Sequence, residues 1–166
     1  MQELAAARIG ETHNQYADSR LRRDRLADYL ARHAHAAILL VGEAAGYRGA
    51  RVSGIPFTSE RQLTGVGPAE ATATIVQRVL AELGLRERVL LWNVVPTHPG
   101  TETSNRKPTR AEVEAGLPFA RRLAAGRRVV AVGRLAQAAL EGVDHVPHPA
   151  RGGARAFAGE LGRICG

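Results

Sequence analysis

The sequence contains very little cysteine and almost no lysine. Cys165 is the single cysteine among 166 residues, which excludes a disulfide framework and any zinc or iron–sulfur site with several thiolate ligands. No apolar stretch approaches the roughly 20 residues that span a bilayer, and the N-terminus lacks the charged-then-apolar layout of a signal peptide. The histidines show no HExxH-type spacing. We therefore expect a soluble cytoplasmic protein with no membrane partner, no metal and no cofactor.

The basic residues are almost all arginine. Of 23 basic residues only Lys107 is a lysine, and the formal net charge is +7. The planar guanidinium group matches the geometry of phosphate oxygens, so this composition favours an acidic partner such as nucleic acid. A GC-rich genome that encodes arginine in place of lysine would give the same composition. Composition alone leaves both explanations open.

Apolar runs alternate with helix-prone segments along the chain. Apolar runs predict strands buried on both faces, as in parallel sheets, at 37–41, 89–95 and 129–132. A fourth short strand is expected to end near Val146. Helical patterns cover 68–83, 109–125, 134–140 and 154–164. The alternation predicts a three-layer α/β/α sandwich around a central, mostly parallel four-stranded sheet. We expect a single domain over 1–166, with 1–36 as a helical segment packed on it.

Local signals predict where individual helices begin and bend. Pro68 stands where a proline is favoured, in the first turn of a helix. Thr109 with Glu112 matches a capping box at the start of another helix. Pro118 lies within that second helical pattern and predicts a kink or a break there.

Three loops rich in polar and turn residues each follow a predicted strand. These loops cover residues 42–67, 93–108 and 148–153. In an open parallel sheet such loops meet at the carboxyl edge, which is where ligands bind. The sequence therefore predicts one site that is built from three separate segments.

Short motifs occur in these loops in a recognisable order. They are Gly42-Glu43-Ala44-Ala45-Gly46, Gly54-Ile55-Pro56-Phe57, Asn93 near a strand end, and His148-Pro149. This set, at these strand ends, resembles the uracil-DNA glycosylase superfamily over roughly residues 37–160, in the branch whose first motif is written GEAPG. The resemblance implies that superfamily's fold and its activity, which is cleavage of the N-glycosidic bond of a nucleotide flipped out of DNA.

The resemblance implies a role for one residue of each later motif. Phe57 would stack on the flipped base, Asn93 would read its edge with an amide donor and acceptor, and His148 would stabilise charge on the departing base. Judged from the residues alone, Phe57 could instead belong to the core and Asn93 could cap a loop. His148 could equally lie on the surface beside a turn proline.

The first motif would hold the edge of the base through its backbone and through Gly42, Ala44, Gly46 and Tyr47. In the strict uracil branch an aromatic residue at the position of Gly46 blocks substituents on pyrimidine C5. Glycine removes that wall, so a 5-substituted pyrimidine could enter by size, unless Tyr47 refills the space.

The motifs also depart from the family pattern. The best-known branch has a water-activating aspartate where this sequence has Ala44, and Ala45 replaces the usual proline. Glu43 is the first candidate for a substitute catalytic carboxylate, and Glu60 is the second. The GEAPG-like branch normally holds an iron–sulfur cluster on four cysteines, which this sequence lacks. The chain therefore resembles a side branch without the cluster.

Basic and polar residues of the three loops are candidates for DNA contacts. Charged loop residues are usually only solvated, but these belong to the same segments as the predicted site. Arg151 is the only large residue between Pro149 and Gly153, so it is the candidate side chain that enters the vacated base stack. The predicted DNA-contacting residues are Arg48, Arg51, Ser59, Arg61, Arg106, Lys107, Arg151 and Arg155.

These features together predict a monomeric, monofunctional DNA glycosylase that acts in base-excision repair. It would leave an abasic site, with water as the nucleophile and uracil as the default base. A first alternative is the same chemistry on a bulky 5-modified cytosine, such as glucosylated hydroxymethylcytosine of phage DNA, in anti-phage defence. A second alternative, which Ala44 and Ala45 would fit, is a catalytically inactive DNA-binding module.

Overall fold

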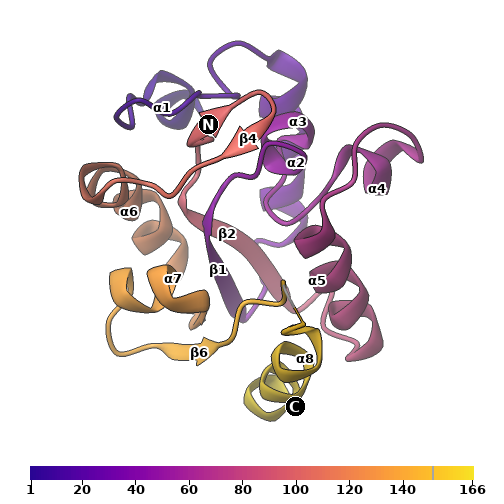
Figure 1. Ribbon diagram of the computed structural model, residues 1–166. Coiled ribbons are helices and arrows are strands. Elements are labelled where there is room, and N and C mark those ends of the chain that lie inside the picture. The colour runs from indigo at the N-terminus through magenta and orange to yellow at the C-terminus, as the bar shows by residue number, and fades with distance from the viewer. Residues whose placement is uncertain (151) are drawn as a thin grey trace.

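A four-stranded sheet lies at the centre of the computed structural model, which describes residues 1–150 and 152–166 (Figure 1). The strands are β1 (Ile38–Ala44), β2 (Val89–Val95), β5 (Arg128–Val132) and β6 (Asp144–Val146), in the order β2-β1-β5-β6. Each pair of neighbouring strands in this sheet is parallel. The predicted α/β sandwich is confirmed, and its sheet is entirely rather than mostly parallel.

Helices cover both faces of the sheet. One face carries α6 (Arg110–Ala124) and α7 (Gly133–Ala139), and the other carries α2 (Arg20–Arg32), α5 (Ala71–Glu82) and α8 (Ala154–Cys165) (Figure 1). Parallel strands need such crossovers because the chain must return to the same edge before the next strand begins. Because both faces are covered, β2 is buried along all seven residues. This burial explains the continuous apolar runs in the sequence.

The N-terminal segment is less helical than its composition predicts. α1 (Gln2–Ala6) and α2 are separated by an irregular stretch over residues 7–19. The side-chain amide of Asn14 donates to the carbonyls of Leu4 and Ala7, at 2.8 and 3.0 Å, and so binds the chain where the first helix ends. Leu4 and Leu26 both belong to the hydrophobic core, so the segment packs on the rest of the fold.

The long loops contain short elements that the sequence pattern did not predict. The first loop includes α3 (Ala50–Ser53) and α4 (Glu60–Thr64), and the second includes a hairpin of β3 (Gly100–Thr101) and β4 (Ser104–Asn105). Pro68 does not open α5, because its carbonyl accepts from the Arg61 N–H at 3.3 Å and the helix begins only at Ala71. Elements of two to five residues are too short to leave a periodic pattern.

The start of α6 is as predicted, but its middle is not. Thr109 and Glu112 form a reciprocal capping box, in which each side chain accepts from the other residue's backbone N–H. The helix continues through Pro118, so the predicted break is wrong. Gly116 packs so closely on the Val94 carbonyl that an added Cβ would overlap it. This packing against β2 holds α6 together around the proline.

Candidate active site

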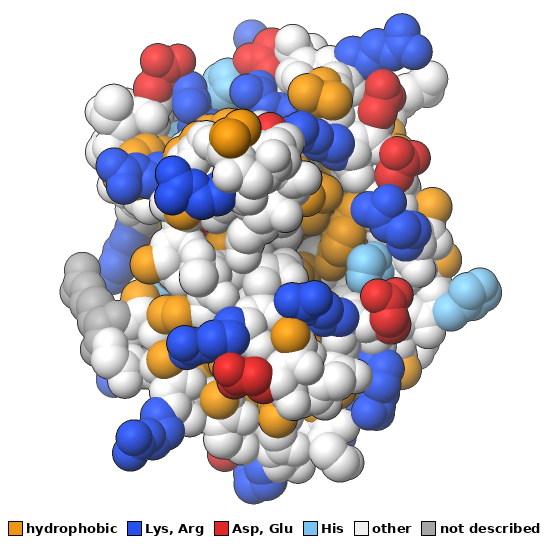
Figure 2. Space-filling view, turned by 90° about the vertical axis from the view of Figure 1, so that its right-hand side faces the viewer, with side chains coloured by type: hydrophobic (Ala, Val, Ile, Leu, Met, Phe, Trp, Pro, Cys, Tyr) orange, Lys and Arg blue, Asp and Glu red, His pale blue; other side chains and the backbone are white. Residues whose placement is uncertain are grey.

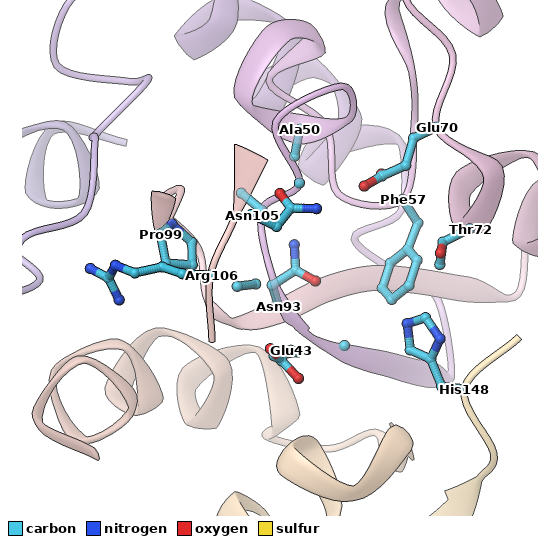
Figure 3. A pocket seen from close by; sticks show the side chains of 14 residues that line it. Glu43, Ala50, Phe57, Glu70, Thr72, Asn93, Pro99, Asn105, Arg106 and His148 are labelled. Atoms are coloured by element: carbon cyan, nitrogen blue, oxygen red, sulfur yellow. The ribbon is translucent and has the colours of Figure 1, made fainter. Parts of the chain in front are cut away.

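A cavity of about 200 Å³ opens at the carboxyl ends of β1 and β2 (Figure 3). All three predicted loops contribute to its wall, as expected for the carboxyl edge of a parallel sheet. The predicted catalytic and base-contacting residues that line it are Gly42, Glu43, Ala44, Gly46, Phe57, Asn93 and His148. The structure thus brings together residues that lie more than a hundred positions apart in the sequence.

Phe57 forms one wall of the cavity and is held there in an uncommon conformation. Its φ of 51° makes it the one described non-glycine residue with a positive φ. Gln77 Nε2 donates to the Phe57 carbonyl at 3.2 Å and fixes this turn. The ring lies against Gly42, where an added Cβ would overlap it. Strain of this kind persists only where the surroundings impose it, and it often marks a functional site.

Asn93 lies beside Phe57 because of the strand register. Gly42 on β1 pairs with Asn93 on β2, and a Cβ on Gly42 would lie 2.9 Å from Asn93 Oδ1. The residue is only 3% exposed, yet its amide faces the cavity and makes no hydrogen bond to any residue in 1–150 or 152–166 (Figure 3). A buried amide without a partner is unfavourable, so this site is suited to a ligand that supplies both a donor and an acceptor.

Glu43 and His148 lie at the same end of the cavity (Figure 3). Burial raises the pKa of the Glu43 carboxyl, and the positive charge of Lys107 partly offsets this rise. His148 lies at the exposed rim, where its Nδ1 accepts from the Ala150 N–H at 3.2 Å. In the neutral imidazole this hydrogen bond leaves the proton on Nε2.

Glu70 is a cavity residue that the sequence analysis missed. Its side chain lies over Gly46 and Gly49, where a Cβ on either glycine would overlap its carboxyl oxygens. Gly46 therefore does not leave an empty space, as the sequence suggested, because Glu70 fills it. Burial raises the pKa of the Glu70 carboxyl. The sequence contains one hint of this role, which is that Glu70 is an acidic residue close to the predicted start of the helix at Pro68.

Asn105 is a second cavity residue that the sequence analysis did not single out. The β3–β4 hairpin carries it to the cavity, and its Oδ1 accepts from the Tyr47 N–H at 2.9 Å. His98 anchors the hairpin, because its ring nitrogens lie 2.7 Å from the Ala45 carbonyl and 2.8 Å from the Thr101 carbonyl. The contacts with Tyr47 and Ala45 join segments more than fifty residues apart, so no local sequence pattern reports them.

Tyr47 does not line the cavity, in contrast to its predicted role in base binding. Its backbone N–H is engaged by Asn105, and its ring lies 5.3 Å from the Arg48 guanidinium carbon. Glu60, the second candidate for a catalytic carboxylate, is also outside the cavity. It forms a bidentate ion pair with Arg25, with distances of 2.8 and 3.0 Å. Both residues serve the packing of the surrounding loops.

The predicted DNA-contacting residues fall into different environments. Ser59 is fully buried and its Oγ accepts from the Glu70 N–H, so its predicted phosphate contact is wrong. Arg51 pairs with Glu102 at 2.8 Å, and Arg61 Nε donates to the Gly67 carbonyl at 3.1 Å. The side chains that remain exposed without such a contact are those of Arg48, Lys107 and Arg155. Arg151 lies outside the described residues.

Arg106 lines the cavity but is already engaged by an acidic partner. Its two terminal nitrogens donate to the Glu112 carboxylate at 2.7 and 2.6 Å. The Arg106 guanidinium is the main reason that the pKa of Glu112 is lowered to about 2. Arginines elsewhere on the surface are interspersed with acidic and apolar side chains, as one face of the molecule shows (Figure 2). Charge alone therefore does not locate the site.

Comparison with known proteins agrees with the fold and with the location of the cavity. A family model described as the uracil DNA glycosylase superfamily matches residues 30–162. Among solved structures, wild-type SMUG2 of Pedobacter heparinus aligns with a TM-score of 0.70 and 12% identity, over 98% of this chain and 93% of that chain. At this identity the likeness establishes the fold alone. No curated protein matches the chain.

Two further classes of feature are absent from the described part of the chain. Across residues 1–150 and 152–166, no helix combines the length and the apolar character that crossing a membrane requires. Within the same residues, no three His, Cys, Asp or Glu side chains are grouped so that they could hold a metal ion.

Proposed function

The chain belongs to the uracil-DNA glycosylase superfamily, and on that premise we propose that it is a monofunctional DNA glycosylase. It would hydrolyse the N-glycosidic bond of a flipped pyrimidine, with uracil as the default base, and leave an abasic site in base-excision repair. The observation that carries the proposal is the convergence of Phe57, Asn93 and His148 on one cavity at the carboxyl edge of the sheet.

Recognition of the base rests on a stacking surface and an amide. The Phe57 ring offers a face on which a flipped base can stack. The Asn93 amide offers one donor and one acceptor, which match the N3–H and O4 of uracil. Because neither group is engaged by another described residue at the cavity, a base can enter without displacing a protein hydrogen bond from Asn93.

Cleavage would proceed by hydrolysis. The bond between deoxyribose C1′ and base N1 breaks, and its electron pair leaves with the base. The His148 Nε2–H donates to O2, which gains negative charge in this step. A water oxygen bonds to C1′ and its proton passes to the Glu43 carboxylate, whose raised pKa makes it a stronger base than an exposed glutamate. Lys107, the single lysine of the sequence, does not line the cavity, and the proposed reaction includes no Schiff-base lyase step.

Two observations support alternatives to this function. Ala44 and Ala45 stand in the cavity wall where a catalytic carboxylate and a rigid proline would be expected, which favours an inactive DNA-binding module. The polar wall formed by Glu70 beside Gly46 favours a base with a polar group on C5, such as a 5-modified cytosine of phage DNA. The proposed function and its two alternatives each predict a different result in one assay.

The decisive assay measures abasic-site formation by alkaline cleavage. The substrates are single- and double-stranded oligonucleotides with uracil, hypoxanthine, 5-hydroxymethyluracil, 5-hydroxymethylcytosine or its glucosylated form. We expect cleavage of uracil. Cleavage confined to a modified cytosine would support the phage-defence alternative, and saturable binding without product on any substrate would support the inactive module.

Substitution of the site residues tests the assignment of roles. Asn93→Ala and His148→Ala should each lower the rate of cleavage by about 100-fold or more, because each removes a group that acts on the base or on its developing charge. DNA affinity should be largely retained. His35→Ala, which removes an exposed histidine outside the cavity, is the matched control and should leave the rate unchanged. Near-normal cleavage by both site variants would contradict the assignment.

A further inference from the structure

Glu70 places a fixed carboxyl group on the cavity wall. Its backbone is held on both sides, because its N–H donates to Ser59 Oγ at 2.8 Å and its carbonyl accepts from the Thr74 N–H at 3.0 Å. The side chain then crosses Gly46 and Gly49, both of which lack the Cβ that would collide with it. Two glycines and a buried serine thus combine to hold one acidic side chain at the cavity.

No structural role within the protein accounts for this carboxyl group. Glu70 occupies the N-cap position of α5, but its side chain makes no capping hydrogen bond. Among residues 1–150 and 152–166 its carboxyl oxygens have no hydrogen-bond or ion-pair partner, and burial alone raises its pKa. A partly buried carboxyl without a partner is unfavourable to the folded state, whereas a ligand that supplies a donor removes that cost.

The position of Glu70 relative to the other site residues indicates which part of a base it would meet. In the view of Figure 3, Glu70 lies above the Phe57 ring and His148 lies below it, with the Asn93 amide beside the ring. A pyrimidine that places O2 at His148 and N3 at Asn93 turns its next ring atoms, C4 and C5, toward the Glu70 side. This order follows from the connectivity of the pyrimidine ring.

We propose that Glu70 is a specificity-determining residue that accepts a hydrogen bond from a donor group on C4 or C5 of the flipped pyrimidine. The inference rests on the proposed glycosylase function and names the base class that the same cavity selects. An ionised carboxyl accepts but cannot donate, so it favours an amine on C4 or a hydroxyl on a C5 substituent. It gains no hydrogen bond from an unsubstituted uracil, which has no donor on C4 or C5 and is bound by Asn93 through N3–H and O4.

The test compares bases that differ by one donor. Single-turnover excision is measured at pH 8 on single-stranded oligonucleotides with uracil, thymine, 5-hydroxymethyluracil or 5-methylcytosine at one position. 5-Hydroxymethyluracil adds a hydroxyl to the C5 methyl group of thymine, and 5-methylcytosine has an amine in place of the C4 keto group of thymine. The wild-type protein should excise at least one of these two bases about tenfold faster than thymine, as expected for a hydrogen bond to a charged group. The base that is excised faster shows whether Glu70 accepts from a hydroxyl on the C5 substituent or from an amine on C4.

Variants at position 70 show whether Glu70 causes the preference. Glu70→Ala should excise the donor-bearing base no faster than thymine. Glu70→Gln, which keeps the side-chain volume over the two glycines and can also donate, should reduce the preference over thymine and raise uracil excision relative to the donor-bearing base. Glu82→Gln, on the exposed end of the same helix, is the control and should match the wild type.

The outcomes separate this inference from the function on which it rests. Product from none of the four bases with the wild-type protein would contradict the glycosylase function itself. If the wild-type protein excises neither donor-bearing base faster than thymine, or if the preference persists in Glu70→Ala, the proposed role of Glu70 is overturned. The glycosylase function is not contradicted by either result. A parallel loss of excision of every base in both Glu70 variants would also overturn the proposed role of Glu70, because a general catalytic or structural role predicts that result.

Discussion

At the scale of single residues, a small side chain at the cavity matters because it leaves space for its neighbours. Gly42 illustrates this, because its missing side chain is the space that the Phe57 ring and Asn93 Oδ1 occupy. Phe57 has little freedom to move away, since its backbone has a positive φ and is anchored by Gln77. The position of the Phe57 ring relative to the Asn93 amide therefore depends on a glycine that has no side chain.

Gly42→Ala tests this dependence. The added methyl group would overlap the Phe57 ring and approach Asn93 Oδ1, so it would displace both groups. We expect kcat/KM for the best substrate to fall by about 100-fold, since small errors in position are costly in catalysis. Overpacking should lower the free energy of unfolding by about 1–3 kcal/mol. Urea denaturation and excision kinetics measure the two effects separately.

A second glycine supplies the matched control for Gly42→Ala. Gly159 lies within α8, and a Cβ at this position would meet nothing within 4 Å. Gly159→Ala should leave excision unchanged and stabilise the protein by up to about 1 kcal/mol, because alanine has the higher helix propensity. If Gly42→Ala also kept full activity, the close approach to Phe57 would not matter for catalysis.

At the scale of elements, Glu112 joins three segments of the chain. Besides the Arg106 guanidinium, its carboxylate accepts from the backbone N–H of Thr109 at 2.8 Å and of Glu11 at 3.2 Å. One side chain thus caps α6, holds the N-terminal segment and fixes the arginine at the cavity. Such a buried charge is compatible with the folded state only because all of these donors surround it.

Glu112→Gln should therefore destabilise the protein in a pH-dependent way. The pKa of Glu112 is lowered to about 2 in the folded state, whereas an unfolded chain gives about 4.3. Its ionisation thus stabilises the fold fully above the unfolded value, by on the order of 3 kcal/mol, and this contribution is lost as the pH falls from 4.3 toward 2. Urea unfolding should show a large difference from the wild type at pH 7 and a smaller one at pH 3.

The exposed neighbour Glu114 controls for the change of charge. It pairs with Arg110 on the solvent side of the same helix, so Glu114→Gln should change the free energy of unfolding little at either pH. Equal destabilisation by Glu112→Gln at pH 7 and pH 3 would show that the network depends on shape rather than on ionisation.

At the scale of the whole molecule, we expect the proposed DNA contacts to be limited to the basic residues near the carboxyl edge of the sheet. Arg48 follows β1, Lys107 follows the hairpin after β2, and Arg155 lies in the first turn of α8, beyond the His148 loop. Arg48 and Lys107 are exposed cations of two loops that build the cavity, and Arg155 is exposed in the first turn of the helix that follows the third loop. Arginines at the opposite edge, such as Arg163 near the end of α8, lie far from any DNA held at the cavity.

Removing cations at this edge should weaken binding without regard to sequence. Arg48→Ala and Lys107→Ala should each lower DNA affinity, and each should reduce the slope of log affinity against log salt by about one, because one phosphate contact is lost. Fluorescence anisotropy across a salt series measures both quantities. Arg163→Ala should change neither. An unchanged slope in all three variants would place the DNA on another face.

Much of the fold follows from local sequence, and less of the site does. The apolar runs predicted β1, β2 and β5 because strands covered on both faces of a parallel sheet are mostly apolar. The α6 capping box was predictable because its two hydrogen bonds join residues three apart. The irregular stretch after α1 was not, since the Asn14 side chain bonds to carbonyls seven to ten residues away.

The sequence by itself determined the sandwich and the motifs that carry Phe57, Asn93 and His148, because the alternation of elements and the order of the motifs are properties of the chain. Only the tertiary structure decided what fills the space over Gly46 and which candidates reach the cavity. Glu70 lies there and Ser59 is buried, although neither position has a pattern that reports it. The physical reason is that occupancy of a cavity and pairing of charges are properties of segments brought together by folding.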